Sequence, residues 1–169
     1  MVQRLPVEEF LSRSKGKTII DVRSPKEFAH AHIPGAISLP LFSDDERAEV
    51  GTAYKHQGRE AAMMIGLKYY GANMQRIISG IKENGNPKEL YMHCWRGGMR
   101  SGVVSWMLDL FGYKVFTLEK GYKSFRHFIL AQFEKKYPFH ILGGRTGSAK
   151  TLVLHELQKK NQQTINLEG

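Results

Sequence analysis

The amino-acid sequence predicts an α/β fold, in which a mostly parallel sheet is flanked by helices. Short, β-branched apolar runs alternate with helical patterns along the first 137 residues, as in parallel-sheet proteins. The 169 residues, 41% of them hydrophobic, suffice for one full core with about thirty residues left over. A strand, a glycine-rich loop and a helix are expected again after residue 137. We therefore predict two domains, 1–137 and 138–169, of which the second is truncated.

The first half of the chain begins with a predicted strand at 18–22, which has the length and β-branching of a buried strand. The segment from Ser24 to Glu27 has the pattern of a capping box with proline at the first helical position, and predicts a short helix to about residue 31. A second short strand is expected at 36–40. A second capping signature, from Ser43 to Glu46, follows, and helical spacing then dominates residues 43–84 and predicts two or three helices.

The second half continues the alternation of strands and helices. We predict strands at 89–93 and 114–118, and helices at 101–111 and 121–136. The last of these helices carries aromatic and aliphatic residues on one broad face, so it is expected to close the first domain. The proline at 138 disfavours helix at the preceding residue and predicts the domain boundary.

The overall composition restricts the compartment and the partners. The formal net charge of +9 favours an anionic partner such as nucleic acid or a phosphate ester, although such a charge also suits a surface that only maintains solubility. Cys94 is the only cysteine, which excludes an intramolecular disulfide and a four-cysteine zinc site. No metal centre is predicted. No signal peptide or apolar span of about 20 residues is present, so a cytoplasmic protein without membrane contact is expected.

Cys94 directly follows a predicted strand and lies six residues before Arg100, so it begins a C-x5-R loop. A loop between a strand end and a helix start can direct successive backbone amides inward and form a binding site for anions. Gly97 and Gly98 are expected to permit this curvature, because glycine adopts positive φ without a steric penalty. Such a positive field favours the thiolate, the nucleophilic form of the cysteine. Arg100 could clamp an oxyanion through two hydrogen bonds, and Arg96 either assists or is a solvated surface charge. The residues predicted to supply loop amides are Trp95, Gly97, Gly98 and Met99.

A purely structural role for Cys94, as a small buried side chain, is the main alternative. It is disfavoured because a structural turn does not need two glycines enclosed by two arginines directly after the only cysteine. For three other polar residues the structural interpretation prevails. Asp21 and Arg23 are expected to tie loops together, and His93 is expected to be packed at a strand end.

Four segments resemble known families. Residues 21–28 and 32–36 resemble the amino-terminal signatures of rhodanese-like domains. Residues 93–101, His-Cys-Trp-Arg-Gly-Gly-Met-Arg-Ser, and 46–55 resemble the tRNA 2-selenouridine synthase family. The resemblance implies a rhodanese-like fold and a transferase that replaces the 2-thio sulfur of the tRNA wobble uridine with selenium. It also implies selenophosphate and geranyl diphosphate as co-substrates, a geranylated intermediate, and the anticodon loop of tRNA as partner. Cys94 would then hold or attack the chalcogen.

Other functions remain open for the same loop. It is one residue longer than the loop of thiosulfate-using rhodaneses and resembles that of rhodanese-fold phosphatases, which indicates room for a phosphate-sized substrate. A phosphatase or arsenate reductase is one alternative, disfavoured because no candidate acid aspartate lies in the loop or directly after it. A non-catalytic sulfur carrier or tRNA-binding module is another.

The segment after residue 138 predicts a phosphate-binding loop, or P-loop. A strand at 139–142, the glycine-rich loop and a helix at 152–160 follow in the order that such a loop requires. A strand-helix-strand unit is expected, and the rest of a P-loop domain would be missing. Ala149 replaces the usual glycine, and positive φ there would cost about 1–3 kcal/mol, so only weak nucleotide binding with magnesium is expected. The predicted phosphate-binding residues are Gly144, Thr146, Gly147, Ser148, Lys150 and Thr151.

Overall fold

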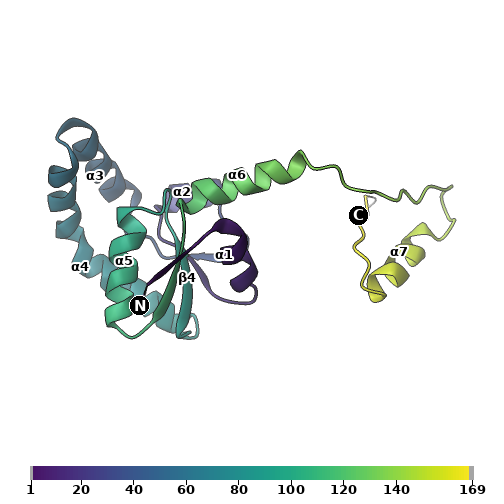
Figure 1. Ribbon diagram of the computed structural model, residues 1–169, viewed down its shortest axis with the longest axis horizontal. Helices are drawn as coiled ribbons and strands as arrows, with labels where there is room; N and C mark the ends of the chain where they lie inside the picture. Colours follow the sequence, from purple (N-terminus) through teal and green to yellow (C-terminus); the bar gives the residue numbers. More distant parts are fainter. Residues whose placement is uncertain (1, 168–169) are drawn as a thin grey trace. The chain divides into compact units, whose positions relative to one another are not determined.

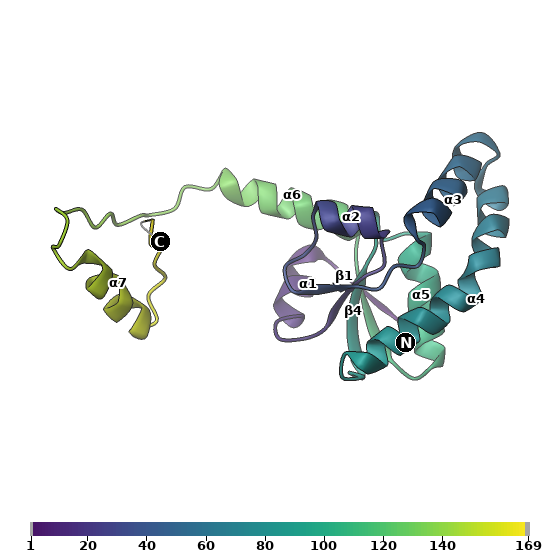
Figure 2. The same ribbon diagram turned by 180° about the vertical axis from the view of Figure 1, so that it is seen from behind.

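The computed structural model describes residues 2–167, and the chain divides into two compact units between Glu134 and Lys135. The predicted boundary lies three residues later. The first unit contains a five-stranded parallel sheet with the strand order β1-β5-β4-β2-β3 (Figures 1 and 2). The strands are β1 (Gln3–Leu5), β2 (Ile19–Asp21), β3 (Ala36–Ser38), β4 (Glu89–His93) and β5 (Lys114–Leu118).

Helices cover both faces of this sheet, because alternate residues of the central strands are apolar on either side. On one face, Met92 of β4 packs with residues of α4 (Arg59–Glu83) and α5 (Met99–Leu110). On the other face, Tyr91 packs with Phe10 of α1 (Val7–Arg13) and Tyr122 of α6 (Gly121–Phe133). The predicted fold class, a parallel sheet flanked by helices, is confirmed.

The parallel register brings the carboxyl ends of the strands to one edge of the sheet. Asp21 pairs with His93 across β2 and β4, so the segments that follow these two strands begin side by side. Cys94 follows His93 directly. The edge where sites form in parallel sheets is therefore the edge that carries the cysteine loop.

Between β3 and β4 the chain forms a helical hairpin of α3 (Asp44–His56) and α4, whose turn projects away from the sheet (Figures 1 and 2). The start of α3 has the predicted capping box: the Glu46 amide donates to Ser43 Oγ at 3.2 Å, and the Ser43 amide donates to the Glu46 carboxylate at 2.8 Å. The capping box predicted at Ser24 and Glu27 is also present, at the start of α2 (Pro25–His30).

Two elements near the amino terminus were not predicted. Strand β1 has three residues, of which only Leu5 is buried, and α1 has seven. Neither is long enough to show a hydrophobic period in the sequence. Strand β1 forms because its backbone completes a parallel ladder with β5, a contact between residues more than 100 positions apart.

The expectation that one broad apolar face of residues 121–136 closes the first domain is only partly right. Helix α6 ends at Phe133, and within it Tyr122 and Phe125 are buried. Leu130 and Phe133 are 51% and 81% exposed. The helix extends beyond the sheet against which its first turns pack, so the apolar residues of its last turns have no surface of this unit to cover (Figure 1).

The strand predicted at 139–142 is wrong, as is the strand-helix-strand unit: residues 135–167 contain one helix, α7 (Lys150–Lys159), and no strand. A parallel strand needs a hydrogen-bonded neighbour, and nothing in this unit supplies one. Phe139 and Ile141 are 71% and 93% exposed. The last two residues of the predicted second domain, 168 and 169, lie outside the described residues. Between residues 2 and 167, no helix is both long and apolar enough to cross a membrane.

Candidate active site around Cys94

The thiol of Cys94 lies at the carboxyl end of the central strand β4, where the chain turns into α5. The side chain is buried, and its Sγ is 3.2 Å from Ser101 Oγ. Ser101 is on the first turn of α5, and its hydroxyl donates to the Gly98 carbonyl at 3.3 Å, so the Cys94 thiol is the donor toward Ser101 Oγ in this arrangement. Ser101 was not among the predicted site residues, although it ends the motif that predicted the loop. The sequence shows that Ser101 is seven residues after Cys94, but only the folded turn of the helix places its hydroxyl beside the sulfur.

Two glycines allow the cysteine loop and the start of α6 to lie in direct contact. Gly97 has φ +62°, and a Cβ there would lie 2.8 Å from the Leu118 carbonyl oxygen. Gly121 has φ +59°, and a Cβ there would overlap the Cys94 carbonyl. Both positions therefore require glycine. The close approach lets the Tyr122 amide donate to the Cys94 carbonyl at 2.8 Å.

Gly98 has a different role from the one predicted. Its φ is −101°, so it does not use the left-handed region, and it is the residue that caps α5. Its carbonyl accepts the Gly102 amide at 3.0 Å. Only Gly97 supplies the positive φ expected of the two glycines.

The backbone amides of residues 95–101 form the electropositive part of the site. Within residues 2–167, none of these seven amides donates a hydrogen bond to a protein acceptor. They include the predicted loop amides of Trp95, Gly97, Gly98 and Met99, and they end at the positive terminus of α5. A run of unpaired amides at a helix start is suited to an anion. The loop thus combines a buried thiol with donors for a negatively charged substrate.

Arg100 lies in this loop, but its guanidinium is bound to Glu27 of α2, at 2.6 and 3.2 Å. Arg47 of α3 approaches the same carboxylate at 3.9 Å. Partial burial alone would raise the pKa of Glu27, but the hydrogen bonds and charge of Arg100, the Ser24 amide and Arg47 together lower it below its ordinary value. Glu27 was predicted only as a helix cap. It performs that role, accepting the Ser24 amide at 3.1 Å, and also holds Arg100.

Arg96 is exposed, and no hydrogen bond or ion pair joins it to any residue between 2 and 167. Its position in the middle of the loop leaves the charge in solvent. The structure therefore gives the two predicted arginines different environments: one is held by a carboxylate and the other is solvated.

Asp21 and Arg23 form a buried ion pair beneath the loop, as expected for residues that tie loops together. The Arg23 guanidinium donates to both Asp21 carboxylate oxygens and to the Ala31 carbonyl, and lies 4.0 Å from the centre of the Tyr122 ring. His93 is fully buried, 3.7 Å from Asp21, and neither ring nitrogen has a hydrogen-bond partner within the described chain. Burial lowers its pKa to about 4, against the opposing charge of Asp21. His93 is thus packed and neutral near pH 7.

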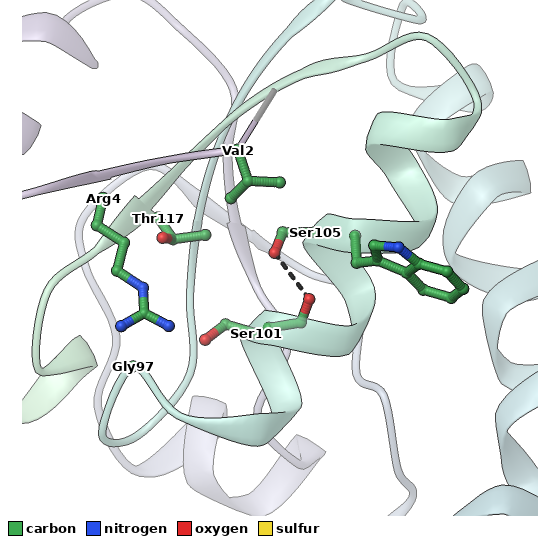
Figure 3. A pocket seen from close by; sticks show the side chains of 8 residues that line it. Val2, Arg4, Gly97, Ser101, Ser105 and Thr117 are labelled. Carbon is green, nitrogen blue, oxygen red and sulfur yellow. Dashed lines mark hydrogen bonds between the residues drawn. The ribbon is translucent and has the colours of Figure 1, made fainter.

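A pocket of about 340 Å³ adjoins the loop on the side of β1 (Figure 3). Gly97 and Ser101 form part of its wall, and the remaining lining comes from β1, β5, α5 and Val2, which precedes β1. Arg4 of β1 extends along it toward the loop (Figure 3). Arg4 was not predicted as a site residue, because nothing in the sequence marks its short strand.

The predicted phosphate-binding residues of the second unit lie in a loop before α7. Ala149 has φ +57°, so the residue that replaces the usual glycine does adopt the left-handed conformation. Lys150 Nζ donates to the carbonyls of Gly144 and Arg145, both at 3.1 Å, and Ser148 Oγ donates to the latter at 2.8 Å. The lysine is thus folded onto its own loop. Thr146, Gly147 and Thr151 are exposed.

Comparisons with known proteins agree with this geometry. The model of the family described as "Rhodanese-like domain" matches residues 6–127. A tRNA 2-selenouridine synthase of Serratia proteamaculans is 38% identical over 89% of this chain and 41% of its own length. One of Shewanella denitrificans is 38% identical over 99% and 48%. A solved structure from Clostridium difficile 630, named "N-terminal domain of putative ATP/GTP binding protein", has a TM-score of 0.70 and 37% identity, over 76% of this chain and 99% of its own.

The chain thus spans about two fifths to half of the length of these synthases. The matched range 6–127 contains every strand from β2 to β5 and the whole cysteine loop. On this match, with the parallel sheet and the loop at its carboxyl edge, the chain belongs to the rhodanese-like domain family.

Proposed function

We propose that this chain is the cysteine-bearing part of a tRNA 2-selenouridine synthase, a transferase in which Cys94 handles the chalcogen. The observation that carries the proposal is the position of the buried thiol beside seven backbone amides without protein acceptors. The similarity to tRNA 2-selenouridine synthases, at 38% identity, supports tRNA as the substrate. The overall reaction replaces the 2-thio sulfur of the wobble uridine with selenium from selenophosphate, through a geranylated intermediate.

The site suits this chemistry because the donors are anions. Selenophosphate and geranyl diphosphate both carry tetrahedral phosphate groups, and amides at a helix start bind such groups without bringing a carboxylate near them. The Ser101 hydroxyl, 3.2 Å from Cys94 Sγ, can donate a hydrogen bond to the thiolate. With a sulfane donor such as thiosulfate, the thiolate attacks the outer sulfur, the S–S bond to sulfite breaks, and sulfite leaves with the electron pair. A persulfide remains on Cys94.

Arg100 and Arg96 have different parts in this proposal. An oxyanion that enters the loop competes with Glu27 for the Arg100 guanidinium, which the carboxylate holds in position beforehand. Arg96 is exposed and adds attraction for an approaching polyanion. The anticodon loop of tRNA is the proposed polyanion, in keeping with the net charge of +9. At the predicted P-loop, a nucleotide with magnesium would bind weakly, because Lys150 must first leave its carbonyl partners.

The proposal is tested by incubating the chain with selenophosphate, geranyl diphosphate and a 2-thiouridine anticodon stem-loop RNA, and analysing the digested nucleosides by mass spectrometry. Wild type is expected to give 2-selenouridine, and Cys94→Ser none. Hydrolysis of p-nitrophenyl phosphate is measured in parallel. Cys94-dependent phosphatase turnover without any modified nucleoside would favour the phosphatase alternative. Binding of the RNA without either reaction would favour a carrier or binding module.

A further inference from the structure

The pocket beside the cysteine loop contains a cation that no other part of the site uses. The side chain of Arg4 is exposed, and no hydrogen bond, ion pair or ring contact joins its guanidinium to any residue that the structure describes. In the register of β1 and β5 it lies opposite Thr117, and both residues line the pocket. Figure 3 shows the guanidinium of Arg4 and the hydroxyl of Ser101 directed toward the same space near Gly97.

Three nearly buried hydroxyls also line the pocket. The side chains of Ser101, Ser105 and Thr117 are 1%, 2% and 5% exposed. Ser105 Oγ donates to the Gly102 carbonyl at 3.0 Å (Figure 3), and Ser101 Oγ donates to the Gly98 carbonyl at 3.3 Å. The Thr117 hydroxyl has no side-chain hydrogen bond within residues 2–167, so it can rotate to donate to an anion, and Ser101 can do the same by releasing its long bond to Gly98. None of the residues that line the pocket is acidic.

From these observations we infer that the pocket is a binding subsite for a tetrahedral oxyanion, a phosphate or phosphate-like group, held by Arg4 with the hydroxyls of Ser101 and Thr117. This inference rests on the proposed function, because it locates the phosphate of a substrate beside Cys94. Ser101 connects the two sites: its Oγ lines the pocket and lies 3.2 Å from Cys94 Sγ. The planar fork of an arginine suits the paired oxygens of such a group.

A comparison of Arg4 with Arg100 strengthens the assignment. Arg100, the cation that the sequence predicted for this role, is bound through two hydrogen bonds to Glu27, and an incoming anion must displace that carboxylate. Arg4 has no carboxylate to release. The volume of about 340 Å³ is at the lower end of the range of small-molecule pockets, about 300–1,000 Å³, and accommodates a phosphate with part of a nucleotide.

The test measures the binding of inorganic phosphate to the full chain by titration calorimetry, in wild type and in Arg4→Ala, Arg4→Lys and Thr117→Val. Arg59→Ala, which removes an exposed arginine at the start of α4, is the matched control. We expect Arg4→Ala to weaken phosphate binding about tenfold or more, Thr117→Val by a few fold, and Arg59→Ala by less than about twofold. Arg4→Lys should retain part of the affinity. Circular dichroism checks that each variant is folded.

A second arm identifies the source of the phosphate. A short oligouridylate is compared with and without a 5′-phosphate, in wild type and Arg4→Ala. Arg4-dependent binding of inorganic phosphate assigns the subsite to a free donor. If only the 5′-phosphorylated oligonucleotide binds in an Arg4-dependent manner, a phosphate of the nucleic acid occupies the subsite. If neither probe binds wild type more tightly than Arg4→Ala, the inference is overturned.

Failure of this inference and failure of the proposed function give different results. Sulfur uptake by Cys94 from thiosulfate is measured by intact-protein mass in the same variants. If Cys94 takes up sulfur but phosphate binding does not depend on Arg4, only the subsite is wrong. If phosphate binding depends on Arg4 but Cys94 takes up no sulfur from thiosulfate, the subsite stands and the transferase proposal fails.

Discussion

The two units of the chain each contain a glycine-rich loop before a helix, and they differ in what lies behind the loop. The Cys94 loop follows the central strand of a sheet, and Gly97 and Gly121 lock it against α6. The loop before α7 follows a segment without strand structure, and Lys150 donates to the carbonyls of that loop. The surroundings thus keep the amides of the Cys94 loop away from the chain's own acceptors, whereas the lysine of the second loop is bound to such acceptors.

The largest difference between the units should appear in the loss of stability when a leucine is replaced by alanine. Leu108 of α5 is fully buried, whereas Leu152 of α7 is 66% exposed. We expect Leu108→Ala to lower the free energy of unfolding by about 2–5 kcal/mol, because it leaves a cavity in the core. Leu152→Ala should change it by less than about 0.5 kcal/mol. Urea denaturation measures both, and equal losses would contradict the contrast between the two units.

The second-largest difference is expected in how a histidine of each unit makes the stability depend on pH. In the folded state His93 binds a proton only near pH 4, whereas in the unfolded chain it does so near pH 6.5. The unfolded state therefore takes up the proton first, and stability falls as pH is lowered from about 6.5 toward 4, by at most about 3 kcal/mol. Urea denaturation between pH 5 and 7 measures the slope, in a range where Glu27 remains ionised.

His93→Gln should flatten that slope, and His140→Gln in the second unit should leave it unchanged, because His140 is exposed. If wild type and His93→Gln have the same slope between pH 5 and 6.5, His93 is not the buried neutral group described above.

The smallest expected difference concerns two ion pairs of equal length. Arg100 and Glu27 lie 2.6 Å apart with side chains 18% and 23% exposed, whereas Lys159 and Glu156 lie 2.6 Å apart but are 71% and 63% exposed. Glu27→Gln should destabilise the fold by about 1 kcal/mol, because it weakens both a half-buried pair and a helix cap. Glu156→Gln should have no measurable effect by urea denaturation. If Glu156→Gln lowered the free energy of unfolding more than Glu27→Gln, the partly buried pair would not be the more stabilising of the two.

The sequence predicted most of the first unit because its strands and helices carry their own signals. Strands β4 and β5 were placed at their observed bounds, and both capping boxes are present. Strand β1 could not be predicted, since a three-residue strand has no period and forms only through its pairing with β5. The strand at 139–142 was predicted wrongly because the sequence shows an apolar run but not whether a partner strand exists. An apolar run becomes a strand only where such a partner is present.

The site was predictable only in part, for similar reasons. Cys94 and the loop amides are contiguous in the sequence, so their grouping needed no knowledge of the fold. Glu27 contacts Arg100 across 73 positions of the chain, and Arg4 is placed beside the loop by the pairing of β1 with β5, in which it lies opposite Thr117. Long-range contacts of this kind leave no local pattern, and Glu27 already had a sufficient local explanation as a helix cap.

The central claim is that Cys94 accepts a chalcogen, and intact-protein mass spectrometry tests it most directly. Wild type, Cys94→Ser and Lys150→Ala are incubated with thiosulfate, and their masses are recorded before and after reduction with dithiothreitol. We predict one added sulfur atom in wild type and Lys150→Ala, removed by the reductant, and none in Cys94→Ser. An unchanged wild-type mass, with Cys94 still open to alkylation by iodoacetamide, would contradict it.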